Sequence, residues 1–385
     1  MPGPGSRFVH TGFERDPATG ALTPAVYRAV SFHHEDPERP LRWDYSRSGN
    51  PTRDALEGAI AALEGGVRGF AFASGNQAIT AAFLLFAAGD HLIVTADCQG
   101  GTQRLVRAVL SRFGLRVSYV DTDDLDAVRQ AVRPETKAVL VENFSNPFLR
   151  VSDIAALAEL AHRQGIRLIV DNTFLTPYLQ APLGLGADLV LHSATKMIAG
   201  HGDVTAGLAA TADQELARSL YTVQNATGGM LSPDDSYQVL RGLHTLPLRM
   251  ERAQATALGL AEWLLAQPEV MEIHYPGLEE DPGHRTAART ARGFGNMVTV
   301  RLEDARLVAP MARHLGMIRV GAGFGGPETA ISLPELHCHA ALTASERQER
   351  RLTGEILRFS VGLEDLADIE GDLRQALDRA AAQIQ

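Results

Sequence analysis

Cysteine is scarce in this chain of 385 residues, which holds only Cys98 and Cys338. Two cysteines this far apart do not make a disulfide framework and favour a reducing compartment. Long apolar runs are also missing, because the longest, at 78–88, contains Thr80 and is too short to cross a bilayer. Residues 1–16 lack the apolar core of a signal peptide. We therefore expect a cytoplasmic protein with no membrane partner.

Runs of basic residues are absent as well, and the net charge is −10 at pH 7. This balance argues against nucleic acid or an anionic membrane as the main partner. The remaining composition, with 45% apolar and 21% charged residues, is ordinary for a globular protein. A chain of this length exceeds one compact core, so we expect two domains and a terminal arm.

Short apolar runs alternate with helix-like stretches between residues 54 and 210. The expected strands lie at 69–73, 91–95, 116–120, 138–142, 168–171, 189–192 and 206–209, and the expected helices at 76–87, 102–113, 125–132 and 154–164. Strands separated by helices predict βαβ crossovers and a mostly parallel α/β sheet covered on both faces. Ligands bind at the carboxyl ends of such strands, so the loops that follow them are where chemistry is expected.

The expected domain boundaries follow from changes in this pattern. They are an arm at 1–53, a large α/β domain at 54–233, a linking helical segment at 234–274, and a small α+β domain at 275–385. Pro247 is expected to kink the linking helix or to break it in two. In the small domain the sequence predicts strands at 297–302 and 356–361 and a terminal helix at 366–384.

Two of the loops hold groups suited to a charged ligand. Gly75 and Asn76 stand where the first strand gives way to a helix, and free N–H groups at a helix N-terminus bind phosphate. A helix cap with a turn glycine is the simpler explanation of this loop. Asp171 ends a buried strand, which is costly unless a protonated pyridine nitrogen or a metal meets it. A helix cap or a structural ion pair is the alternative.

Lys196 follows another buried strand. Desolvation there lowers the pKa of a lysine, and a neutral amine is what a Schiff base requires. Ser193 and Thr195 are expected to point the same way from an extended segment and to donate to a phosphate. Alone, Lys196 is better explained as a solvated surface residue. Its occurrence together with Gly75 and Asp171 at strand ends of one sheet favours a cofactor.

Two further motifs carry weaker signals. The segment GAGFGG at 321–326 matches a dinucleotide fingerprint, but it lies in the small domain and no clear helix follows it. The run His337, Cys338 and His339 suggests a metal, but successive side chains of one short segment rarely converge on one ion. We therefore expect neither a nicotinamide cofactor nor a metal.

Several longer motifs are more specific. They are YSRSGNPTR at 45–53, DNTF at 171–174, HSATK at 192–196 with GHGD at 200–203, and LRFSVG at 357–362. On these motifs the chain resembles the Cys/Met-metabolism group of fold-type I pyridoxal phosphate enzymes, from Thr11 to the C-terminus. The resemblance implies PLP fold type I, with a mostly parallel central sheet and a smaller C-terminal domain, and pyridoxal 5′-phosphate as cofactor. It also implies a homotetramer, built as a dimer of dimers with active sites shared across each dimer.

The resemblance implies a role for each candidate residue. Lys196 would hold the cofactor and move protons, Asp171 would pair with its pyridine nitrogen, and Arg358 would clamp the substrate carboxylate. The other cofactor-binding residues would be Tyr45, Arg47, Gly75, Asn76, Gln99, Asn146, Ser193 and Thr195. Of these, Tyr45 and Arg47 would come from a neighbouring subunit. The residues that contact the substrate would be Asn146, Gly323, Glu328 and Arg358.

The chain also departs from the family at named positions. Gln99 replaces a tyrosine that stacks on the cofactor ring and aids proton transfer. Gly323 stands where the family has serine, and Met197 where it has tyrosine. These departures bear on substrate and rate rather than on cofactor binding.

The resemblance favours γ-elimination or γ-replacement on a sulfur amino acid or an activated homoserine, of the cystathionine γ-synthase or γ-lyase type. Glu328 matches a glutamate that faces the distal end of the substrate in those members. The first alternative is β-elimination, as in cystathionine β-lyase. The second is a weakly active PLP-binding paralogue with a scaffold or regulatory role, against which Lys196, Asp171 and Arg358 argue.

Overall fold

A seven-stranded sheet forms the centre of the large domain in the computed structural model, which describes residues 3–12, 15–16, 18–340 and 342–384. Its strands stand in the order β1-β7-β6-β5-β4-β2-β3. Their bounds are β1 (Arg68–Phe72), β2 (His91–Thr95), β3 (Arg116–Val120), β4 (Thr136–Glu142), β5 (Arg167–Asp171), β6 (Leu189–His192) and β7 (Gly207–Thr211). β7 runs antiparallel to both of its neighbours, β1 and β6, and all the other pairings in the sheet are parallel. The predicted mostly parallel α/β sheet is confirmed.

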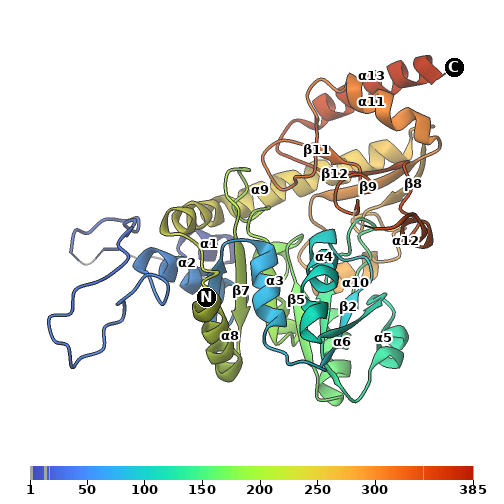
Figure 1. The fold of residues 1–385 in the computed structure, drawn as a ribbon. Coiled ribbons are helices and arrows are strands. Elements are labelled where there is room, and N and C mark those ends of the chain that lie inside the picture. Colours follow the sequence, from blue (N-terminus) through green and yellow to red (C-terminus); the bar gives the residue numbers. More distant parts are fainter. Residues whose placement is uncertain (1–2, 13–14, 17, 341, 385) are drawn as a thin grey trace.

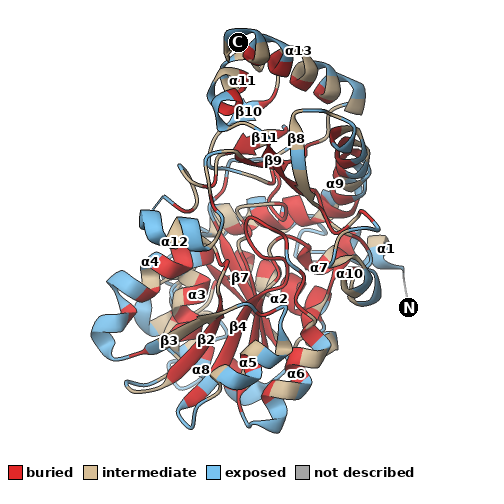
Figure 2. Cartoon of the chain, turned by 90° about the vertical axis from the view of Figure 1, so that its right-hand side faces the viewer, coloured by how far each residue is buried: buried red, intermediate tan, exposed pale blue. Residues whose placement is uncertain are grey.

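Helices cover both faces of this sheet (Figure 1). They are α2 (Pro51–Glu64), α3 (Gly75–Phe83), α4 (Gly100–Ala108), α5 (Leu125–Ala131), α6 (Ile154–Arg163), α7 (Thr176–Leu179) and α8 (Gln214–Thr227). Figure 2 shows the strands buried between helices whose outer faces are exposed. A strand covered on both faces must be apolar along its whole length, and β2 is buried throughout. This double burial explains why the strands are read from sequence as continuous apolar runs.

A single helix, α9 (Pro233–Leu265), runs from the large domain to the small one (Figure 1). It is 33 residues long and continues through Pro247, so the predicted alternative of a break is wrong. Proline removes one backbone hydrogen bond, but the helix buries Leu243, Leu246 and Met250 in the core on either side of it. Tertiary packing of this face therefore outweighs the local cost of the proline.

A five-stranded sheet in the order β10-β11-β12-β9-β8 forms the small domain. Its elements are β8 (Val270–His274), α10 (His284–Thr290), β9 (Met297–Leu302), α11 (Val308–His314), β10 (Arg319–Val320), β11 (Ala330–Ser332), α12 (Ala344–Glu349), β12 (Ile356–Ser360) and α13 (Leu366–Ile384). The edge strand β8 lies inside the range expected as a linking segment, and it pairs with β9. The second sheet therefore begins at Val270, before the expected boundary at 275.

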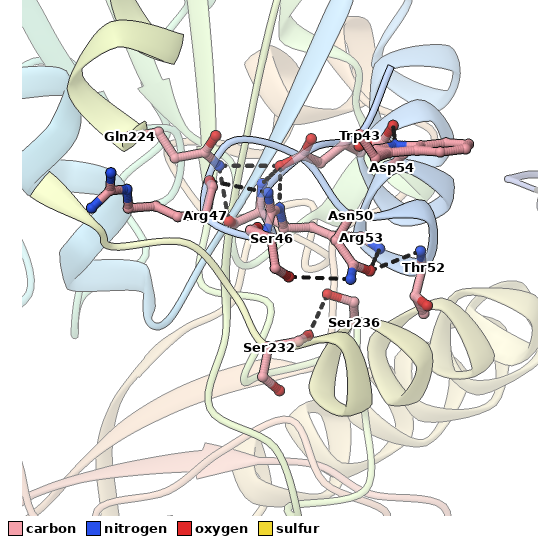
Figure 3. A network of polar contacts seen from close by, with 12 residues as sticks. Trp43, Ser46, Arg47, Asn50, Thr52, Arg53, Asp54, Gln224, Ser232 and Ser236 are labelled. Carbon is pink, nitrogen blue, oxygen red and sulfur yellow. Dashed lines mark hydrogen bonds and ion pairs between the residues drawn. The ribbon is translucent and has the colours of Figure 1, made fainter. Parts of the chain in front are cut away.

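The N-terminal region lies outside both sheets. Its helix α1 (Pro4–Val9) buries Phe8 against the body, whereas the chain from 18 to 50 runs outward as a mostly exposed loop (Figure 1). The loop returns where buried Arg53 donates hydrogen bonds to the carbonyls of Ser46 and Arg47 and Asn50 caps α2 (Figure 3). Among the described residues, no helix has the length and apolarity needed to span a bilayer.

Candidate active site

A cavity lies at the carboxyl ends of β4, β5 and β6, where the sequence predicts the chemistry. Five of the candidate residues line it, namely Gln99, Asn146, Asp171, Ser193 and Lys196. The lining is completed by Glu142, Asn143, Phe144, Thr173, Phe174 and Phe324. Side chains from four strand ends and from the small domain therefore converge on one space.

Lys196 stands in a turn that follows β6. Its Nζ lies 4.1 Å from the ring centroid of Phe324, and burial lowers its pKa to about 8, with the positive charge of Arg358 adding to the effect. The predicted desolvation of this lysine is confirmed. The predicted extended segment is wrong, because residues 194–199 form turns. Within them the Thr195 hydroxyl bonds the backbone carbonyl and N–H of Ala206, at 3.1 and 3.0 Å.

Two carboxyl groups stand side by side at the ends of β4 and β5. Asp171 accepts hydrogen bonds from the N–H and hydroxyl of Thr173, at 3.0 and 2.5 Å, which lower its pKa against the larger raising effect of burial. Glu142 is its register partner, and burial followed by the charge of Asp171 raises the pKa of Glu142 well above its ordinary value. Glu142 also accepts a 2.6 Å bond from the Gln99 N–H. The arrangement favours a proton on Glu142 and a charge on Asp171.

Arg358, on β12 of the small domain, lies next to the cavity and contacts two of its lining residues. Its side chain is buried, with its Cζ 4.8 Å from the ring centroid of Phe324 and its Nη1 2.5 Å from the Asn146 Oδ1. The Arg358 Nε has no hydrogen-bond partner among the described residues. A buried guanidinium with a free donor, next to two lining residues, is suited to an anionic group such as a carboxylate.

The donor set fits a phosphorylated pyridine cofactor. Ser74 caps α3, and the structure gives the backbone N–H groups of Gly75 and Asn76 no partner among the described residues. A Cβ on Gly75 would come within 2.7 Å of the Ser193 Cβ, so glycine lets α3 begin directly against this lining residue. Helix N–H groups here, the Asp171 carboxylate in the cavity and the Lys196 amine match the phosphate, ring nitrogen and aldehyde of pyridoxal phosphate.

Four candidate residues lie away from this cavity. Tyr45 and Arg47 lie in the arm and line a separate hollow beside Gly228. Gly323 is exposed, with its neighbour Phe324 reaching the cavity instead. Glu328 is exposed, lies 3.6 Å from Arg319 and is not among the residues that line the cavity. The roles of these residues stay predictions.

Sequence reasoning missed Glu142 and Phe324. Glu142 ends an apolar run beside the run that ends in Asp171, so the same strand-end argument could have found it. Phe324 lies in the segment that resembles a dinucleotide fingerprint. Nothing in that segment indicates that its phenyl ring contacts both Lys196 and Arg358. No cluster of potential metal ligands occurs in the part of the chain that the structure describes.

The sequence matches the family described as Cys/Met metabolism PLP-dependent enzyme over residues 5–378. The chain belongs to this family. Pyridoxal phosphate is therefore its cofactor, and the protein is a PLP-dependent enzyme. The recognised resemblance and the fold class are both confirmed.

Three relatives illustrate the range of the family. Cystathionine β-lyase MetC of Bacillus subtilis is 45% identical, covering 98% of this chain and 96% of the relative. The structure of cystathionine γ-lyase from Lactobacillus plantarum has a TM-score of 0.97 and 40% identity, covering 99% of this chain and 100% of that one. Cystathionine γ-synthase from Xanthomonas oryzae pv. oryzae has a TM-score of 0.96 and 38% identity, covering 99% of each chain.

Labelling of the apoenzyme tests the lowered pKa of Lys196. A lowered pKa means that the neutral, reactive amine forms at lower pH, so a small amine-reactive reagent should label Lys196 with a midpoint near pH 8. In urea-unfolded chains the midpoint should move up towards 10.5, the ordinary value. Peptide mapping of samples labelled across pH 6–11 measures the midpoint for Lys196 in the folded and in the unfolded chain. Identical midpoints in folded and unfolded chains would contradict the desolvated environment.

Proposed function

We propose that this enzyme catalyses γ-elimination or γ-replacement on a four-carbon amino acid of trans-sulfuration, such as cystathionine or an activated homoserine. The observation that carries the proposal is that Lys196 and Asp171 line one cavity and that Arg358 contacts two other residues of its lining. High similarity to a γ-lyase and a γ-synthase over nearly the whole chain supports it. A cavity with this complete set of groups is not what a scaffold paralogue would need to keep.

The chain's own residues divide the work in this proposal. When bound, pyridoxal phosphate supplies an electron sink for the charge that develops at the substrate Cα. Arg358 binds the substrate carboxylate and orients Cα towards Lys196, whose amine takes and returns protons. Asp171 stays anionic beside the pyridine nitrogen. Gln99 cannot exchange a proton at ordinary pH, so proton transfer rests on Lys196.

β-Elimination from cystathionine is the second candidate. The 45% identity to a cystathionine β-lyase favours it. The two reactions differ in the carbon that loses the sulfur, and both use the same lysine, aspartate and arginine.

Product analysis with cystathionine separates the two candidates. With water, γ-elimination releases 2-oxobutyrate, ammonia and cysteine, whereas β-elimination releases pyruvate, ammonia and homocysteine. We expect 2-oxobutyrate, or cystathionine formation when an activated homoserine and cysteine are supplied instead. Pyruvate as the main oxoacid product would replace the first candidate with the second. No turnover of either substrate by cofactor-loaded protein would contradict both.

Gln99→Tyr is expected to raise the rate with cystathionine. An aromatic ring over the cofactor adds stacking of about 0.5–1.5 kcal/mol, equivalent to roughly two- to tenfold, and a phenol can exchange a proton. Steady-state kinetics of this variant against Gln164→Tyr, an exposed position after α6, measures the effect. Loss of turnover in Gln99→Tyr alone would instead identify Gln99 as a specificity contact for a different substrate.

The proposal includes a homotetramer of two dimers that share their active sites, with Tyr45 and Arg47 reaching the neighbouring subunit. Their exposed position in the arm, away from their own cavity, supports this. Inactive Arg47→Ala chains mixed with inactive Lys196→Ala chains should regain activity, because a mixed dimer keeps one intact site. Mixtures of Lys196→Ala chains with Arg358→Ala chains should stay inactive, because one chain supplies both residues to its own site and no mixed dimer keeps an intact site. If the two mixtures showed the same activity after verified subunit exchange, the active sites would not be shared between subunits.

A cytoplasmic location is also part of the proposal. Both cysteines are free thiols, Cys98 buried and Cys338 half-buried, as suits a reducing compartment.

A further inference from the structure

A second cavity, of about 400 Å³, lies where the two domains meet. Residues 148–151 of the large domain form one wall, and β8, the loop before α10 and residues 350–351 form the others. Its lining shares no residue with the cavity around Lys196. Its volume is that of a pocket for a small metabolite.

Arginine is the commonest residue in the lining of this cavity, and two of the arginines pair with carboxylates outside it, Arg150 with Asp121 at 2.9 Å and Arg301 with Glu355 at 2.8 Å. The lining holds four arginines against three carboxylates, namely Arg150, Arg301, Arg350 and Arg351 against Asp123, Glu272 and Asp281. Glu272 is engaged by Arg301 at 2.9 Å, and Asp281 accepts bonds from the backbone N–H groups of Tyr275 and Gly283. These two carboxylates are therefore already satisfied and leave little to attract a cation.

Two of the arginines are only weakly compensated. The Arg351 guanidinium lies 3.8 Å from Glu272 and is largely exposed, and the Arg350 Nη1 donates to the backbone carbonyl of Ala96 at 2.5 Å. Arg351 also has a φ of 55°, a left-handed conformation that costs free energy for a residue with a Cβ. Beside them, the His274 Nε2 is buried with no hydrogen-bond partner among the described residues. Glu272 lies 3.6 Å from this nitrogen and 3.8 Å from Arg351, both beyond hydrogen-bond distance, so the two side chains keep hydrogen-bonding capacity for a ligand.

We propose that this cavity binds a small oxyanion, bearing carboxylate or phosphate groups, as a ligand distinct from substrate and cofactor. The Arg350 and Arg351 guanidinium groups bind its oxygens, in the fork geometry that arginine offers to such groups. His274 stands against Phe148, with ring centroids 5.2 Å apart, and contributes a further polar contact beside an apolar surface. The site is a regulatory one, because two connections join it to the active site.

The first connection runs through Arg350. Its bond to the carbonyl of Ala96 holds the loop that leads to Gln99, which lines the catalytic cavity. The second runs through the segment 145–151, where the Ser145 N–H donates to the Arg150 carbonyl at 3.0 Å. The next residue, Asn146, holds Arg358. An oxyanion that draws Arg350 or Arg150 therefore changes the placement of Gln99 and Asn146.

Calorimetric titration of the holoenzyme tests the site with two probes, citrate for carboxylates and inorganic pyrophosphate for phosphates. We expect saturable binding of one or both, weakened at least tenfold in the double variant Arg350→Ala, Arg351→Ala. The single change Arg351→Glu, at an exposed side chain, gives the same loss without a risk to folding. Arg313→Ala on α11, also exposed, is the matched control and should bind normally.

A further variant separates this site from the active site. Arg358→Ala should keep the binding, since an oxyanion in the catalytic cavity would depend on that arginine. Retained binding in the Arg351→Glu variant, lost binding in Arg358→Ala, or no binding of either probe would each overturn the proposal. Because the readout is binding, the outcome does not depend on which reaction the enzyme catalyses.

Discussion

Lys196→Ala should lose both the covalent link to pyridoxal phosphate and at least about 10²- to 10⁴-fold of the turnover rate, the contribution of a positioned acid–base group. The structure gives the reason, because Lys196 is the only lining residue that combines a nucleophilic amine with a pKa near 8. Near neutral pH part of this amine is neutral, which a lysine of ordinary pKa could not provide. Its removal leaves no neighbour able to take its place.

The experiment is unusually clean because the chain has only two lysines, Lys137 and Lys196. Borohydride reduction of the wild type should fix the cofactor on a single peptide, and the visible absorption band should survive in Lys137→Ala. Lys137 is an exposed residue near the start of β4 and serves as the matched control. In Lys196→Ala, reduction should leave the chain unlabelled. A cofactor-labelled peptide containing Lys137 would show that the anchor was misassigned.

The positions of the central strands could be predicted from sequence because double burial makes strands such as β2 and β6 continuous apolar runs, whereas the edge strand β3 is only half-buried. The runs at 91–95, 116–120 and 189–192 match β2, β3 and β6 at both ends. Helix ends were harder, since they depend on packing. The stretch expected as one helix at 102–113 is α4 followed by a short 3₁₀ turn. The same limit applies to Pro247, where a local rule predicted a possible break and the packed face of α9 prevented it.

The candidate site was predictable where its residues end strands of one sheet. Asp171 and Lys196 meet in the cavity for that reason, because parallel strands bring their carboxyl ends to one edge. Phe324 could not be placed in the same way, since it comes from a loop of the other domain and its position depends on how the two domains pack. The turn at 194–199 was also missed, because an apolar run shows where a strand passes but not how the chain leaves it.

Arg358→Ala should raise KM about 30-fold to several thousand-fold while pyridoxal phosphate stays bound. The loss of a buried, hydrogen-bonded charge contact costs about 2–5 kcal/mol, and each 1.4 kcal/mol is tenfold in affinity. Arg358 is 1% exposed, so its bond to the substrate carboxylate is not weakened by solvent as a surface pair would be. The visible absorption band of the cofactor should remain, because Lys196 and the N-terminus of α3 are unchanged.

Two controls make the result specific to carboxylate binding. Arg358→Lys keeps the charge but not the two-pronged geometry, so its KM should fall between those of wild type and Arg358→Ala. Arg374→Ala removes a guanidinium that pairs with Glu269 on the far side of the small domain, and it should leave KM unchanged. Comparable KM values for Arg358→Ala and Arg374→Ala would remove Arg358 from substrate binding. A lost absorption band in Arg358→Ala would instead mean that this arginine supports the cofactor cavity through Asn146 and Phe324.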